Sequence, residues 1–177
     1  MCIRDRPYNI EYVEQPVAAG DLEAMARVRQ AAQTSPDVTQ LTEAPALRIA
    51  ADEDVTDAAS ARRVFNAAAA DVVIVKPLQA SGLKDWIRLL ELSPGDAVVT
   101  TSIDTGIGTA LALHLAVASG ATYAHGLSTL PLLEDDLILQ TLTVEQGRLG
   151  LPSSPGLGVD VDEAALERYA VSRWQLP

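Results

Sequence analysis

The sequence predicts an α/β fold, because short apolar runs alternate with segments of helical periodicity. Five such strand–helix units follow one another at a pitch of about 25 to 40 residues, which is typical of β/α units. The run 71–75 is apolar after its first residue, as expected of a parallel strand that is buried on both faces. Five parallel units do not close an eight-stranded barrel, so the sheet is either open or the second half of a barrel.

The predicted elements follow from hydrophobic periodicity and from turn residues. Strands are expected at 8–14, 46–51, 71–75, 97–101 and 121–125. Helices are expected at 21–32, 57–69, 82–92, 106–118, 130–137 and 163–171. Residues 138–149 alternate in part between polar and apolar, which favours an antiparallel ribbon, and 153–158 form a loop. The expected N-caps are Asp21, Thr56, Ser81 and Asp162, and Gly120 is expected to end its helix.

The first six residues, Met1 to Arg6, resemble translated sequencing-adapter sequence, and we expect the natural protein to begin upstream of them. This favours the half-barrel over the open sheet. The predicted organisation is a foreign segment at 1–7, a partial β/α barrel at 8–140, and a C-terminal ribbon and helix at 141–177.

Composition excludes several classes of partner. The chain has 177 residues and a formal net charge of −11. Nucleic acids and anionic membranes require a basic patch, so neither is expected as a partner. Cys2 is the single cysteine, which excludes an intrachain disulfide and fits a cytoplasmic setting. No apolar run reaches the roughly 18 residues of a membrane-spanning helix.

Three charged residues each stand at the end of a predicted strand, in the order Glu14, Asp52 and Lys76. The carboxyl ends of parallel strands meet at one edge of a sheet, where β/α barrels build their active sites. Two carboxylates can hold a divalent cation, and a lysine beside them can move protons or stabilise negative charge. Any one of these residues alone would be interpreted as a solvated strand-end residue, so the hypothesis depends on the series.

The motifs around these residues resemble the enolase superfamily, and the muconate-lactonizing subgroup matches best. The segments are 12–16 (Tyr-Val-Glu-Gln-Pro), 51–53 (Ala-Asp-Glu) and 75–77 (Val-Lys-Pro). Segments 101–108, 124–129 and 155–162 resemble the seventh strand, the eighth strand and the C-terminal return of that subgroup. The resemblance implies strands four to eight of a modified TIM barrel, whose N-terminal capping domain would precede this chain.

The resemblance also implies roles for individual residues. Glu14 and Asp52 would be the second and third Mg²⁺ ligands, supported by Glu53, and Lys76 would be the catalytic lysine of the sixth strand. Substrate contacts are expected at Ser102, Asp104, Gly126 and Leu127. The first metal ligand and the Lys-x-Lys motif of the family have no counterpart here, since Glu11 is expected on the opposite face from Glu14 and Lys84 falls in a predicted helix. We therefore expect the chain to be a truncated piece that is inactive alone.

Residues 126–129 (Gly-Leu-Ser-Thr) are more similar to o-succinylbenzoate synthases than to dipeptide epimerases, which bind an ammonium group with acids at this place. This implies a small carboxylate substrate that is dehydrated to o-succinylbenzoate in menaquinone biosynthesis. N-acylamino acid racemase, dipeptide epimerase, muconate cycloisomerase, a non-catalytic barrel relative and an unrelated open α/β domain remain alternatives. A homo-oligomer is compatible with the sequence, and open sheet edges predict self-association. His114 and His125 are expected to be structural, and 106–108 is a weak match to a phosphate loop.

Overall fold

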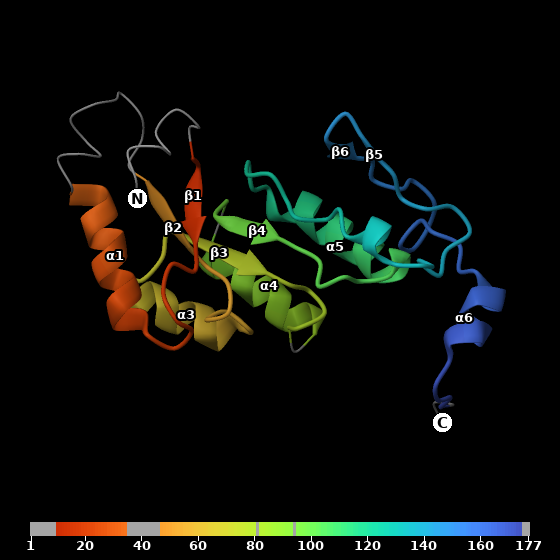
Figure 1. The fold of residues 1–177 in the computed structure, drawn as a ribbon, viewed down its shortest axis with the longest axis horizontal. Coiled ribbons are helices and arrows are strands. Elements are labelled where there is room, and N and C mark those ends of the chain that lie inside the picture. Colours follow the sequence, from red (N-terminus) through yellow and green to blue (C-terminus); the bar gives the residue numbers. More distant parts are fainter. Residues whose placement is uncertain (1–9, 35–46, 81, 94, 175–177) are drawn as a thin grey trace.

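The computed structural model describes residues 10–34, 47–80, 82–93 and 95–174. Its centre is a parallel sheet in the order β1-β2-β3-β4, formed by β1 (Tyr12–Glu14), β2 (Arg48–Ala51), β3 (Val72–Val75) and β4 (Ala97–Val99) (Figure 1). The helices that follow these strands are α1 (Leu22–Thr34), α3 (Ala58–Asn66), α4 (Leu83–Leu92) and α5 (Gly106–Ser119). The first four of the five predicted strand–helix units are thus confirmed, and they form part of a β/α barrel.

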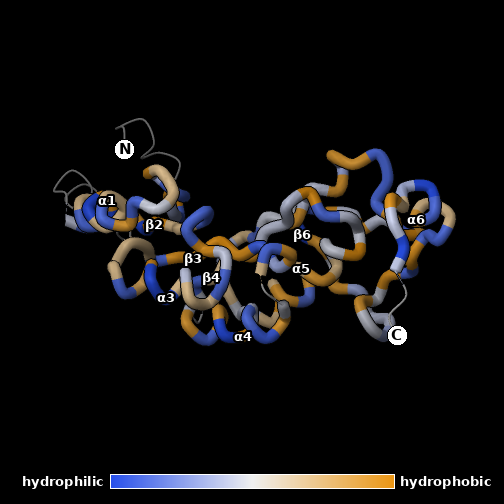
Figure 2. Tube along the Cα trace, turned by 90° about the horizontal axis from the view of Figure 1, so that it is seen from below, coloured by the Kyte–Doolittle hydropathy of each residue, from blue (hydrophilic) through white to orange (hydrophobic). Residues whose placement is uncertain are grey.

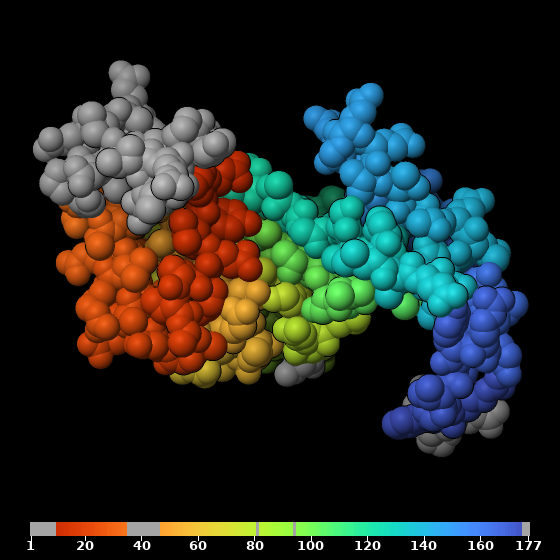
Figure 3. Space-filling model, in the orientation of Figure 1, coloured from red at the N-terminus to blue at the C-terminus, as the bar shows by residue number. Residues whose placement is uncertain are grey.

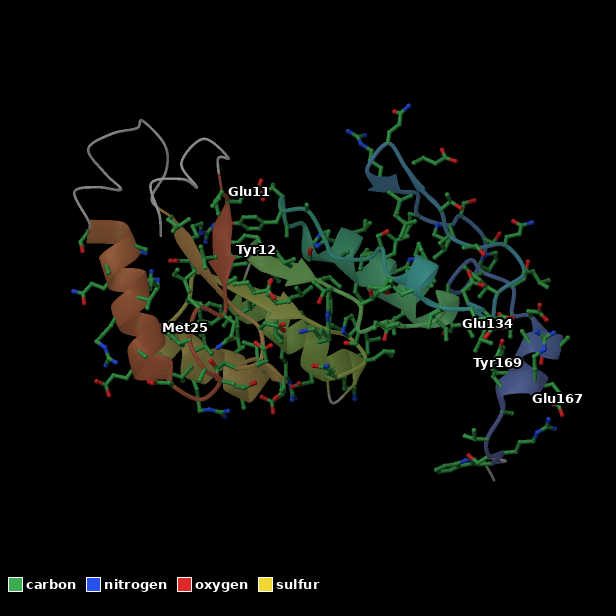
Figure 4. All side chains as sticks on the ribbon, viewed as in Figure 1. Glu11, Tyr12, Met25, Glu134, Glu167 and Tyr169 are labelled. Carbon is green, nitrogen blue, oxygen red and sulfur yellow. The ribbon has the colours of Figure 1, made fainter. Side chains whose placement is uncertain are left out.

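The larger core lies between the sheet and these helices. Ile49, Val73 and Val99 point to this side from three neighbouring strands and are almost completely buried. Met25 of α1 is fully buried against them (Figure 4), as is Val64 of α3. Figure 2 shows the strands as hydrophobic and the helices as mixed, which is expected when each helix buries one stripe and exposes the other.

The opposite face of the sheet, here called the inner face, carries a separate apolar cluster. It consists of Ala50, Val72, Ile74 and Val98, with Tyr12 and Tyr123 packed against them. Side chains alternate along a strand, so residues two positions further on point to the same side. Glu14 follows Tyr12, Asp52 follows Ala50 and Lys76 follows Ile74 at this spacing. The local backbone therefore directs all three charged side chains to the inner face.

The predicted fifth strand at 121–125 is wrong. Only Gly126 pairs with the sheet, through a single parallel bridge to Thr100. The Val99 N–H donates to Nδ1 of His125 at 3.1 Å instead of to a backbone carbonyl. An imidazole ring thus takes a position that a strand would have filled, and the backbone pairing is reduced to one residue.

The C-terminal part also differs from the prediction. The segment 130–137 contains only a short 3-10 helix, Leu130–Leu132, whose second residue is a proline. The expected ribbon at 138–149 is reduced to the hairpin of β5 (Val144–Glu145) and β6 (Arg148–Leu149). The last helix, α6 (Glu163–Tyr169), lies where it was expected, and Figures 1 and 3 show that it projects away from the sheet.

Among the predicted helix caps that lie in the described residues, one is wrong and three are confirmed. The N-cap of α3 is Asp57 and not Thr56: its carboxylate accepts from the Ser60 N–H at 2.6 Å, and the Ser60 hydroxyl accepts from the Asp57 N–H at 2.9 Å. Asp21 and Asp162 cap as predicted. Gly120 ends α5 in the left-handed conformation, as expected. Ser81 and the segment 1–7 lie outside the described residues.

No helix among the described residues is long and apolar enough to span a membrane.

Candidate active site

Glu14, Asp52 and Lys76 come together at the carboxyl end of the sheet, on its inner face. The Lys76 ammonium donates to Oδ1 of Asp52, and the two form an ion pair. Their side chains are 21% and 13% exposed, so this pair is largely shielded from water. Glu14 is more exposed than this pair, and its carboxyl is near enough for the charges of Asp52 and Lys76 to act on its pKa. Three strands thus deliver two carboxylates and one ammonium to one place.

The pKa of Glu14 is raised above its ordinary value. Partial burial is the largest cause, because it disfavours the charged form. The negative charge of Asp52 raises the pKa further, and the positive charge of Lys76 opposes it. A second carboxylate at short range has this effect because two like charges repel. A divalent cation between the two carboxylates would remove the repulsion.

Gln15 and Asp54 connect the loops that carry the two carboxylates, although the sequence analysis assigned neither of them a role. Gln15 accepts from the Asp52 N–H at 2.9 Å and donates to Asp54 at 2.7 Å. The second oxygen of Asp54 accepts from the Gly20 N–H at 2.6 Å. Gln15 has a φ of 37°, which side-chain-bearing residues rarely adopt. The only sequence signals were its place beside Glu14 and the third acid in the run 52–54.

The other predicted site residues lie at different depths. Ser102 is exposed near the site and accepts from Gln79 of the loop after Lys76 at 3.4 Å. Glu53 is exposed beside Asp52, and its charge contributes to the raised pKa of Glu14. Gly126 is exposed and forms the bridge to Thr100. Its lack of a side chain matters, since a Cβ there would lie 2.8 Å from the Thr100 Cγ2.

Asp104 and Leu127 do not point freely into the site. Asp104 is 7% exposed beneath the start of α5, where its Cβ would lie 2.9 Å from a Cβ added at Gly108. That close approach gives Gly108 a packing role. The Leu127 side chain is buried in the core between sheet and helices. Ile103 was missed by the sequence analysis: it has a φ of 61° and is 54% exposed. Such a backbone is strained for a β-branched residue, and strained residues of this kind cluster at active sites and ligand-binding loops.

The donor chemistry at this place fits Mg²⁺, whereas the number of donors is incomplete. Glu14 and Asp52 provide the carboxylate oxygens that this ion prefers. Within the described ranges, no group of three or more His, Cys, Asp or Glu residues could hold a metal ion. Two carboxylates would therefore bind the ion weakly, since Mg²⁺ gives up its water shell reluctantly.

The hollow along the C-terminal ribbon does not include the residues of this site, and both histidines are bonded to the backbone. A hollow of about 830 Å³ lies along the C-terminal ribbon, lined by residues such as Gln140, Arg148 and Asp160, and does not include Lys76. His114 is paired with the Leu157 carbonyl at 3.1 Å, and His125 accepts from the backbone of β4. Burial lowers the pKa of His125, so it stays neutral, as its acceptor role requires.

Comparisons with known proteins give one consistent family. The sequence model described as "Enolase C-terminal domain-like" matches residues 1–165. An o-succinylbenzoate synthase from Thermobifida fusca is 34% identical over 171 residues, which is 95% of this chain and 48% of that protein. A chloromuconate cycloisomerase from Cupriavidus pinatubonensis is 30% identical over 165 residues, and the match covers 91% of this chain and 41% of that protein. An N-succinylamino acid racemase from Thermus thermophilus is 28% identical, with 94% and 42% covered.

Solved structures show the same fold. An enolase superfamily member from Listeria innocua superposes with a TM-score of 0.76 at 21% identity, covering 96% of this chain and 43% of the other. The muconate lactonizing enzyme from Klebsiella pneumoniae gives a TM-score of 0.74 at 26% identity, with 92% and 43% covered. This chain thus spans less than half the length of the relatives that it matches.

Proposed function

We propose, on the premise that this chain belongs to the enolase C-terminal domain-like family, that it carries one half of an active site for proton abstraction next to a carboxylate. The observation that carries the proposal is the convergence of Glu14, Asp52 and Lys76 on the inner face of the sheet. The relatives bear the names of lyases and isomerases, which supports an enzyme family.

In this proposal Glu14 and Asp52 would hold a Mg²⁺ ion, with Glu53 beside them. When bound, the ion supplies fixed positive charge for the negative charge that develops on a substrate carboxylate. Lys76 places its ammonium within the same shielded site, where its charge acts strongly because water is partly excluded. A first carboxylate ligand and a second lysine would complete the site. We assign the activity to a protein that contains all of these groups.

We favour dehydration of a cyclohexadiene carboxylate to o-succinylbenzoate as the reaction. The α proton would be removed by a base outside these residues, and an enediolate would form. The same group, now protonated, would return that proton to the hydroxyl that leaves the neighbouring carbon, so that water is released. Lys76 would face the enediolate as a cation. Ser102 and Gly126, which are exposed, remain proposed substrate-binding residues, whereas the burial of Asp104 and Leu127 argues against direct contact with a substrate.

Two observations support this reaction, the second of them only against a substrate that carries an ammonium group. The match with the T. fusca o-succinylbenzoate synthase has 34% identity, compared with 30% for the chloromuconate cycloisomerase and 28% for the N-succinylamino acid racemase. In addition, the segment 126–129 carries no acid that could pair with a substrate ammonium. A buried ammonium without such a partner would be costly. The next acid along the chain is Glu134, which Figure 4 shows near the C-terminal segment, far from Tyr12 on β1.

A direct test uses the gene extended upstream to encode a complete barrel. We expect turnover of the cyclohexadiene acid, and loss of nearly all activity in the Lys76→Ala variant. Lys84→Ala on α4 is the matched control and should keep its activity. Turnover of N-acylamino acids alone would favour the racemase, the second candidate, which the T. thermophilus relative supports. Hydrophobic residues at the positions of the first ligand and second lysine would argue for a non-catalytic relative.

A further inference from the structure

We propose that Gln15 is a positioning residue that, together with Asp54, fixes the Glu14 and Asp52 carboxylates relative to each other. The inference rests on the proposed metal site, because it concerns the two residues that would hold the ion. Its basis is the set of hydrogen bonds that join the loop after β1 to the loop after β2. We call Gln15, Asp54 and their bonded partners the loop clamp.

The orientation of the Gln15 amide follows from its partners. The Asp52 backbone N–H can only donate, so the carbonyl oxygen of Gln15 must face it, at 2.9 Å. The Asp54 carboxylate can only accept, so the amide nitrogen must face that side, at 2.7 Å. Both ends of one side chain are thus assigned without ambiguity. Asp54 determines which way the amide points, and the amide then holds the backbone of Asp52.

The clamp also explains an unusual backbone conformation. Gln15 has a φ of 37° and precedes Pro16, although a residue before proline favours extended conformations. A strained residue persists only when its surroundings determine it strongly. Here the Gln15 N–H donates to the Ala50 carbonyl at 2.9 Å, and the side chain adds its two bonds across the loops. These three bonds hold the chain directly after Glu14.

Asp54 closes the arrangement on the other side. Its second oxygen accepts from the Gly20 N–H at 2.6 Å, just before α1 begins at Leu22. The loop between β1 and α1 is therefore tied at both ends to the loop that carries Asp52. Neither Gln15 nor Asp54 is a proposed metal ligand or substrate contact, so both would act through the two carboxylates.

The decisive variants keep the net charge constant. Gln15→Ala removes the side-chain bonds to Asp52 and Asp54, and with them the longer bond to the Val17 carbonyl at 3.5 Å. The double variant Gln15→Glu with Asp54→Asn exchanges donor and acceptor. The carboxylate introduced at position 15 would accept from the Asp52 N–H and from the amide nitrogen introduced at position 54, whose amide oxygen would accept from the Gly20 N–H. Gln33→Ala is the matched control, because Gln33 donates to the Asp71 carboxylate at 3.2 Å at the other end of the sheet.

Two measurements on the 177-residue chain test the clamp. Amide hydrogen exchange at Asp52 should accelerate about three- to tenfold in Gln15→Ala, as expected for the loss of one hydrogen bond. The Mn²⁺ affinity, followed by electron paramagnetic resonance, should fall about tenfold, as is usual when a partner of a metal ligand is removed. The exchanged double variant should restore both properties, and Gln33→Ala should change neither.

The contrary outcomes are distinct. If Gln15→Ala lowers the melting temperature while Mn²⁺ affinity stays unchanged, Gln15 is merely structural and the inference is overturned. Failure of the double variant to restore Asp52 protection would overturn it as well. If the wild-type chain binds no Mn²⁺ that Glu14→Gln abolishes, the metal-site proposal fails by itself. In that case, crystal structures of the wild-type chain and of Gln15→Ala test the loop clamp. An unchanged distance between the Glu14 and Asp52 carboxylates would overturn the inference.

Discussion

At the residue scale, the Glu14 and Asp52 carboxylates are placed together at a cost to the folded chain. Burial and the Asp52 charge raise the pKa of Glu14, so the folded state binds its proton more tightly than the unfolded state does. The favourable contribution of protonated Glu14 is complete at pH values below the pKa of unfolded glutamate. It is lost as the pH rises through the raised pKa of the folded state. Lys76 limits the cost because its ammonium neutralises Asp52.

The first prediction concerns Glu14→Gln. This change should raise the melting temperature of the metal-free chain at pH 7, because it removes a carboxylate that the folded state keeps beside Asp52. It should also abolish Mn²⁺ binding at this place. Scanning calorimetry at pH 4 and pH 7 measures the effect, which should shrink at the lower pH. Glu91→Gln, an exposed carboxylate on α4, is the control. A lower melting temperature for Glu14→Gln at pH 7 would contradict the assignment.

At the element scale, α3 is held by its capped start and by its buried stripe of Ala58, Ala61 and Val64. The N-terminus of α3 is closed by the reciprocal bonds of Asp57 and Ser60. These bonds lower the pKa of the Asp57 carboxyl, with the backbone bond from Ser60 as the largest cause. Its stabilising effect is therefore present above the pKa of unfolded aspartate and is lost as the pH falls through the lower folded value.

The second prediction distinguishes the observed cap from the expected one. Asp57→Ala should destabilise the chain by about 1 kcal/mol, the usual cost of removing an N-cap side chain. Thr56→Ala should stay within about 0.5 kcal/mol, because Thr56 is exposed and its side chain does not cap α3. Urea denaturation at pH 7 measures both changes. Equal losses from the two variants would refute Asp57 as the cap.

The third prediction concerns the packing of α1 on the sheet. Met25 is fully buried in the larger core, so Met25→Ala should destabilise the chain by about 2 to 5 kcal/mol through lost burial and a cavity. Met25→Leu conserves most of the volume and should cost less than about 1.5 kcal/mol. The two free energies of unfolding from urea denaturation give the comparison. Similar values for both variants would show that α1 is not packed as described.

At the scale of the entire chain, the sheet is covered by helices on one face and has an open side. In the described part of the chain, β1 pairs only with β2. An unpaired strand edge can pair with another chain. The C-terminal segment that projects in Figure 3 adds exposed apolar residues, with Val171 at 99% and Trp174 at 88% exposure.

The fourth prediction follows from these surfaces. The 177-residue chain should associate with itself as its concentration increases. Its net charge of −11 opposes this association, so added salt should promote it by screening the repulsion. Light scattering in low and high salt provides the measurement. Replacing Val171 and Trp174 by serine should reduce the association if the C-terminal segment contributes. A monodisperse monomer in high salt would contradict the prediction.

The α/β class, four strands, four helices and the charged residues at the strand ends could all be predicted from the amino-acid sequence. These features are local, since apolar periodicity and the position after a buried run belong to one segment at a time. For the same reason the fifth strand and the cap of α3 were predicted wrongly. The His125 ring replaces a strand partner of Val99, and Ser60 selects Asp57 over its neighbour. In both cases two groups compete for the same backbone N–H, and the local sequence pattern does not show which of them binds it.

The direct contacts between the site residues became visible only in the folded chain. Glu14, Asp52 and Lys76 are dispersed along the sequence, and their convergence results from parallel pairing in register together with the alternation of side chains. The positions of Gln15 and Asp54 beside the two carboxylates did not reveal their partners, because a glutamine or aspartate in a loop has no fixed partner until two loops are brought side by side. Strand ends could be located in the sequence, whereas the hydrogen bonds that join them depend on distances set by the folded sheet.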